Sequence, residues 1–98
     1  MLFLIVYDIS INRVRTKIAK ILIAEGYERL QLSVFLGLTN PKENQKVWVT
    51  INKLIQEDTM AKMYILPIPK STLKNIKQLG VEKLDIAYLL GDKNSYYI

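Results

Sequence analysis

Apolar residues along the first third of the chain follow two different periods. Residues 2–9 form a continuous apolar run beside an acid, and their Phe, Ile and Val content predicts a central strand buried on both faces. Apolar positions then recur at helical spacing over residues 12–25, with Ser10 or Asn12 as the expected N-cap. Gly26 suits the left-handed position just past the helix end.

Residues 28–39 switch to strict alternation, which is the clearest strand pattern in the chain. One expected face consists of Leu30, Leu32, Val34, Leu36 and Leu38, and the other of Arg29, Gln31, Ser33, Phe35 and Gly37. At about 3.3 Å per residue, one strand of this length would span roughly 35–40 Å. Because that is long for so small a domain, we expect a bend or a split near Leu32 and Ser33.

The second half of the chain predicts three further elements and a tail. A helix is expected to begin at Asn40, which suits an N-cap because a proline follows it. Residues 61–69 predict an edge strand, because two prolines near its end remove backbone donors. A short helix over residues 71–79 and a last apolar strand over residues 84–90 complete the pattern.

This order of elements predicts an α+β fold, a ferredoxin-like βαββαβ sandwich with two helices on one face of an antiparallel sheet and an extra C-terminal strand. The 98 residues suit a single domain covering 1–98, in which residues 82–98 form the last strand and the tail. An apolar edge strand is an aggregation hazard unless it is paired. We therefore expect this strand to pair with a second subunit.

Composition narrows the chemistry that is open to the chain. The net charge of +5, from 14 Lys and Arg against 9 Asp and Glu, favours a polyanionic partner such as nucleic acid. The absence of Cys and His excludes disulfides, thiolate zinc sites and thiol catalysis, and it removes the commonest general base. The apolar start is too short for a membrane helix and lacks a basic segment before it, so we predict a cytoplasmic protein without membrane contact.

The predicted first helix is rich in cations, and no acid lies between Ile9 and Ala24. Such a face neutralises phosphates and gives salt-sensitive, sequence-independent binding. A solvated helix face is the alternative, but such faces usually mix charge signs. The expected nucleic-acid-binding residues are Arg13, Arg15, Lys17, Lys20 and, on the next strand, Arg29.

Asp8 is the one acid among the first 24 residues, and it stands where the predicted first strand ends. Its carboxylate is the candidate metal ligand and catalytic group, because Mg²⁺ prefers hard oxygen ligands. Capping of the turn into the helix is the alternative role.

Tyr7 is a second candidate, which could position a phosphate or a water; half-buried packing is its alternative role. Ser33 and Phe35 share a strand face, where Phe35 either packs or stacks on a base.

Three segments in register resemble the CRISPR-associated protein 2 family. They are VYDI at residues 6–9, RVRTK at residues 13–17 and RLQLSVF at residues 29–35, the last followed by Gly37. The family pattern has a strand ending in Tyr-Asp, a basic helix start and an R-x-Q-x-S-V-F strand. The resemblance covers residues 1–68, and beyond them it is architectural.

The resemblance implies a homodimer of ferredoxin-like subunits in which the C-terminal strand pairs with the partner's sheet. Such a dimer bridges the CRISPR adaptation integrase and lies under captured duplex DNA. Some members are described as magnesium-dependent endonucleases on RNA or DNA, with the strand-end aspartate, here Asp8, as metal ligand. Since one carboxylate is few for a hydrolytic site, we expect one Mg²⁺ shared by two Asp8 residues across the dimer axis.

Three functions therefore remain open. The first is an adaptation scaffold that binds duplex DNA and an integrase, with magnesium-dependent cleavage. The second is a toxin-type endoribonuclease of the same fold, acting on single-stranded RNA through Asp8. The third is a non-enzymatic regulatory dimer, which is disfavoured because the few glycines form no phosphate loop. The choice decides whether the chain is an enzyme and which nucleic acid it prefers.

Overall fold

The computed structural model describes residues 1–80 and 82–91. Its centre is a four-stranded antiparallel sheet with the order β2-β3-β1-β4. The strands are β1 (Leu2–Asp8), β2 (Glu28–Gln31), β3 (Val34–Gly37) and β4 (Lys62–Ile68). The helices are α1 (Asn12–Ala24), the 3₁₀ turn η1 (Pro41–Glu43), α2 (Gln45–Gln56), α3 (Lys70–Lys74) and α4 (Ile86–Leu89). The predicted α+β, ferredoxin-like plan is confirmed.

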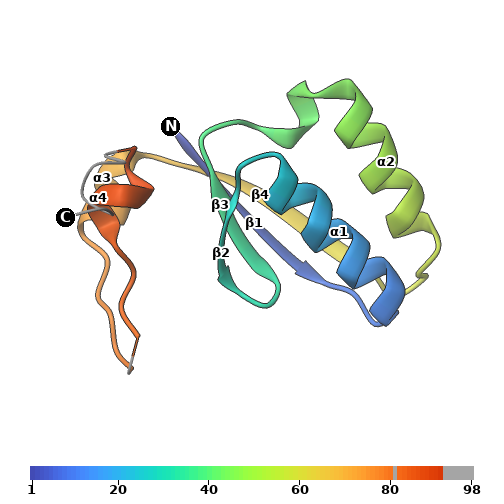
Figure 1. Ribbon diagram of the computed structural model, residues 1–98, viewed down its shortest axis with the longest axis horizontal. Coiled ribbons are helices and arrows are strands. Elements are labelled where there is room, and N and C mark those ends of the chain that lie inside the picture. Colours follow the sequence, from blue (N-terminus) through green and yellow to red (C-terminus); the bar gives the residue numbers. More distant parts are fainter. Residues whose placement is uncertain (81, 92–98) are drawn as a thin grey trace.

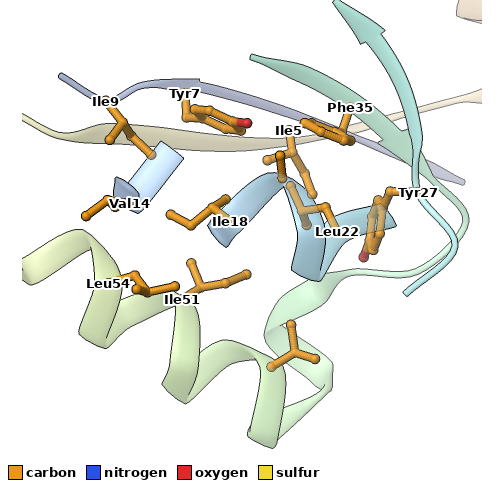
Figure 2. Close-up of a cluster of buried hydrophobic side chains, with 12 residues drawn as sticks. Ile5, Tyr7, Ile9, Val14, Ile18, Leu22, Tyr27, Phe35, Ile51 and Leu54 are labelled. Carbon is orange, nitrogen blue, oxygen red and sulfur yellow. The ribbon is translucent and has the colours of Figure 1, made fainter. Parts of the chain in front are cut away.

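The main core lies between the sheet and the two long helices, which run side by side over one sheet face (Figure 1). Strand alternation turns Ile5 and Tyr7 of β1 toward this core, where they meet Ile18 and Leu22 of α1 (Figure 2). Ile51 of α2 closes the cluster from the other side. The helical spacing that predicted α1 is thus the spacing of its buried face.

The long alternating segment is split, as predicted, at residues 32–33. Its halves, β2 and β3, fold back as an antiparallel hairpin in which Arg29 lies opposite Phe35. Phe35 is fully buried in the main core, whereas Leu36 is buried in a second cluster with Leu2 and Leu73. Both faces of β3 are therefore covered, one by α1 and α2 and the other by the C-terminal helices.

The second long helix begins later than predicted. Asn40 accepts a hydrogen bond from the Lys42 N–H (3.0 Å), but it caps only the short turn η1. Asn44 caps α2 by accepting from the Val47 N–H (3.3 Å). The strand predicted over residues 61–69 is confirmed as β4, and it lies at an edge of the sheet.

The predicted last strand over residues 84–90 is wrong, because the chain forms helix α4 there. Asp85 caps this helix by accepting from the Tyr88 N–H (3.1 Å). Ile86 and Leu90 would share one face of a strand, but because they stand four residues apart they also share one face of a helix, against the second cluster. The helix predicted over 71–79 is formed only as α3, and residues 92–98 of the tail lie outside the described residues.

Two smaller expectations are also decided. Gly26 has a φ of +90°, so it occupies the left-handed position expected after α1. Within residues 1–80 and 82–91, no helix has the length and apolar content that a membrane crossing needs.

Candidate nucleic-acid interface

One end of the sheet brings together most of the predicted site residues. The Tyr7 N–H donates to the Ser33 carbonyl (3.1 Å), which places the β2–β3 turn beside the end of β1. Helix α1 begins at Asn12, four residues after the last residue of β1, Asp8. The strand-end acid, the hairpin turn and the cationic start of α1 therefore belong to the same region.

Asp8 is exposed and closes the β1–β4 ladder opposite Lys62. Its side chain has no ion pair or hydrogen bond within the described part of the chain, so both carboxylate oxygens are available. They fit Mg²⁺, which accepts one or two carboxylates and keeps water or phosphate as its other ligands. No group of three His, Cys, Asp or Glu that suits a metal occurs among the described residues.

Tyr7 lies on the other side of the strand from Asp8, inside the main core. Its hydroxyl donates to the Leu32 carbonyl (3.4 Å). Burial raises the pKa of Tyr7, while the positive charges of Arg29 and Arg15 act in the opposite direction. A buried, neutral phenol with an internal acceptor suits packing, and we leave Tyr7 out of the proposed site.

Arg15 and Arg29 meet at a cavity of about 340 Å³ between the start of α1 and the hairpin turn. The two arginines stand 14 residues apart in sequence, so the fold alone brings them together. The cavity walls also carry amide and hydroxyl groups, which suit a phosphate or sugar. Its lining consists of Asn12, Arg15, Thr16, Arg29, Leu32 and Ser33.

Arg29 is held in a fixed orientation. Its Nη2 and Nε donate to the Leu32 carbonyl at 2.7 and 3.2 Å, and its guanidinium carbon lies 5.4 Å from the centre of the Phe35 ring. These bonds use two of its five N–H donors, and the others remain for a ligand. A guanidinium fixed in this way loses little further freedom when it grips a phosphate.

Phe35 belongs to the core. Its side chain is 0% exposed, and its ring stacks on that of Tyr7 with 6.1 Å between centroids. A ring that no solvent reaches presents no face to a base, so packing is the role that the structure supports. Ser33 of the predicted pair lines the cavity instead.

The other predicted cations do not line this cavity. Arg13 forms an ion pair with Glu57, the C-cap residue of α2, and this is the one salt bridge found among the described residues. Lys17 and Lys20 are exposed on α1. The expected cationic face is thus divided: two of its arginines line the cavity, one arginine is paired with an acid, and two lysines are exposed.

Sequence reasoning missed Asp58, which is buried in the loop between α2 and β4. The predicted caps of α1 are wrong, because the N-cap is Ile11 and its side chain makes no capping bond. The Asp58 carboxylate accepts from the N–H groups of Ser10 (2.7 Å) and Ile11 (3.0 Å) instead. The bond from the Ile11 N–H is the largest cause that holds the pKa of Asp58 below its ordinary value, against the effect of burial.

A second cavity, of about 350 Å³, lies where α1 ends and α2 begins. Glu25, Glu43 and Tyr27 line it. Two carboxylates without an arginine or a lysine in the lining repel phosphate. Nucleic-acid binding is therefore better placed at the opposite end of α1.

The chain is similar to known proteins in sequence and in structure. The family model described as CRISPR associated protein Cas2 matches residues 1–76. A curated relative, the CRISPR-associated endoribonuclease Cas2 1 of Archaeoglobus fulgidus, is 35% identical over 85 residues, which cover 84% of this chain and 89% of the relative.

Two solved structures share the fold. The crystal structure of Streptococcus pyogenes Cas2 at pH 6.5 has a TM-score of 0.66 at 22% identity, covering 82% of this chain and all of the other. A hypothetical protein from Thermus thermophilus, TT1823, has a TM-score of 0.63 at 27% identity, covering 85% of this chain and 94% of the other. The family match extends over every element that forms the sheet and the cationic cavity.

Proposed function

The chain belongs to the CRISPR-associated protein Cas2 family, and from this premise we propose that it works in CRISPR adaptation as a homodimer that binds nucleic acid and bridges the integrase. We propose further that it is a magnesium-dependent endonuclease, in line with the name of its archaeal relative. The observation that carries the binding function is the cavity in which Arg15 and Arg29 converge.

The sheet face away from α1 and α2 supports the homodimer. On this face Leu4 lies opposite Leu66, and Val6 lies opposite Tyr64. Tyr64 is 60% and Leu66 is 43% exposed, so the strip is apolar and open to a partner. Asp8 ends the same strip. A second copy that packs on this face around a twofold axis brings a second Asp8 to the same interface.

The paired Asp8 residues are the proposed metal ligands. Mg²⁺ bound there would supply charge to stabilise the reacting phosphate and would lower the pKa of a bound water. The chain's own contribution is to bind and orient the strand. Arg15 and Arg29 hold neighbouring phosphates, and the exposed Asp8 carboxylates keep their oxygens free for the ion.

Binding is tested by fluorescence anisotropy with a labelled duplex and a labelled single-stranded RNA, at salt concentrations from about 50 to 200 mM. Arg15→Gln and Arg29→Gln should each weaken binding and reduce the slope of log affinity against log salt by about 0.9. Lys53→Gln, at an exposed position near the end of α2, removes the same charge away from the cavity. Equal losses in all three variants would contradict a built site and indicate an effect of net charge alone.

Cleavage is tested with Asp8→Asn and with EDTA, and the dimer by light scattering. Asp8→Asn should abolish cleavage while duplex binding and the melting temperature stay unchanged, because the Asp8 side chain makes no ion pair or hydrogen bond within the described part of its own protomer. Cleavage that survives the substitution rules out Asp8 as the catalytic ligand. Cleavage of RNA without duplex binding favours the toxin-type enzyme, and a dimer with neither activity favours the regulatory alternative.

A further inference from the structure

Asp58 is the one charged side chain that is buried in the described part of the chain, at 5% exposure. A buried carboxylate is costly unless donors satisfy it, and four converge here. Its Oδ2 accepts from Ser10 N (2.7 Å), Ser10 Oγ (2.9 Å) and Ile11 N (3.0 Å). Its Oδ1 accepts from Met60 N (2.9 Å) and lies 3.0 Å from Ser10 Oγ.

These donors come from both segments that adjoin the end of the sheet, the one that follows β1 and the one that precedes β4. The β1–β4 ladder ends at the pair Asp8 and Lys62. Ser10 and Met60 are the residues two positions beyond that pair, and the carboxylate lies between their N–H groups. Asp58 therefore joins the two segments where the sheet hydrogen bonds stop, and it fixes the segment that immediately follows Asp8.

Arg15 binds the same segment by its carbonyl groups. Its Nη1 donates to Ile9 O (2.8 Å) and to Ser10 O (3.4 Å). Asp58 accepts hydrogen bonds from the N–H groups of the turn, and Arg15 donates hydrogen bonds to its carbonyl groups. The turn between the proposed metal ligand and the proposed phosphate-binding arginine is thus held from both sides by opposite charges.

The hydrogen bonds of Asp58 indicate a role beyond stabilising the loop. Apolar packing of equal volume often stabilises a fold as well as buried charge does. Hydrogen bonds to named peptide groups additionally fix the direction of the chain. That direction decides how the Asp8 carboxylate stands relative to the Arg15 guanidinium.

We propose that Asp58 is a positioning residue that fixes the turn at residues 9–11 and thereby sets Asp8 and Arg15 relative to each other for one nucleic-acid strand. The inference rests on the proposed function for its consequence in binding. The fixed turn itself is independent of that function, so the two are tested separately.

The first measurement is NMR on the isolated protein, comparing Asp58→Asn with wild type. The amide of Asn places a donor where one acceptor stood, so some of the converging N–H groups lose their partner. We expect amide exchange at Ser10 and Ile11 to be at least tenfold faster, and the carboxyl ¹³C shift of Asp8 to move. The control is Thr59→Ala, at an exposed neighbouring residue.

The second measurement is the salt dependence of duplex binding, well below the melting temperature. Asp58→Asn should reduce the slope by about 0.9, as Arg15→Gln does, and the double variant should reduce it no further. A purely stabilising role predicts an unchanged slope in the folded variant. If Asp58→Asn does not fold, Ser10→Ala removes only the hydroxyl bonds and should give a smaller change in the same direction.

The outcomes separate the two proposals. Unchanged exchange at Ser10 and Ile11 together with an unchanged Asp8 shift would overturn the positioning role, whatever the binding data. Wild-type protein that binds no duplex would overturn the proposed function, while the NMR result still decides the role of Asp58. Additive slopes in the double variant would also refute positioning through Arg15.

Discussion

The ion pair between Arg13 and Glu57 neutralises one cation of the α1 face that the sequence predicts to bind nucleic acid, so breaking the pair should strengthen binding. Glu57→Gln keeps the side-chain size and frees Arg13. The two side chains are 53% and 41% exposed, so the pair contributes only about 0.2–1 kcal/mol to folding. The melting temperature should therefore fall by a few degrees at most.

The gain in affinity follows from counterion release. One added phosphate contact makes the slope of log affinity against log salt steeper by about 0.9. Extrapolated from 1 M, where this contribution vanishes, such a contact is worth roughly an eightfold gain in affinity at 0.1 M salt. Anisotropy titrations of a labelled duplex at four or five salt concentrations measure both the affinity and the slope.

Glu43→Gln is the matched control, because it makes the same charge change at an exposed residue of η1, beside the other end of α1. It should leave the slope unchanged. An equal gain in both variants would mean that only net charge matters. An unchanged slope in Glu57→Gln would contradict the prediction, because a freed Arg13 would then make no phosphate contact.

Three further predictions concern the scaffold. Phe35→Leu removes the stacking on the Tyr7 ring and the contact with Arg29, so urea unfolding should show a loss of about 1–2 kcal/mol in the free energy of unfolding. A fully stable variant that no longer binds RNA would instead indicate that Phe35 stacks on a base. Gly37→Ala places a Cβ 2.2 Å from the buried Tyr27 ring, and calorimetry should show a loss of about 1–3 kcal/mol in the free energy of unfolding. An unchanged stability would contradict this clash. Because the pKa of Asp58 lies below the ordinary value of 3.8, its ionised carboxylate stabilises the fold at pH values above 3.8, and this contribution is lost as the pH falls below 3.8. Acid titrations of Asp58→Asn should therefore show a smaller fall in stability than those of wild type.

Local patterns predicted the first half of the fold because its elements are determined by neighbours in sequence. The helical spacing of α1, the left-handed Gly26 and the break of the alternating segment at residues 32–33 all follow from steric and packing rules over a few residues. The same rules failed over residues 84–90, where alternation and helical spacing fit the same apolar side chains. The local cap at Asp85 and the second apolar cluster favour the helix there.

The parts of the site that were missed depend on contacts across the chain. Asp58 lies 48 residues from Ser10, and Glu57 lies 44 residues from Arg13. In the sequence alone, both acids look like ordinary residues at the end of a helix. Only the antiparallel packing of α1 on α2 brings them to the start of α1, where one replaces the expected cap and the other neutralises an expected phosphate ligand.

These contacts also explain why charge alone is a poor guide to the site. Of the five predicted cations, Arg15 and Arg29 are the ones whose guanidinium groups are fixed by backbone carbonyls of their own protein. Holding a long side chain in place before a ligand arrives lowers the entropy that binding must overcome. Free lysines on α1 attract a polyanion from a distance, but they lose their own freedom on contact. The binding energy of a phosphate should therefore concentrate at the two arginines, because the fold has already ordered them.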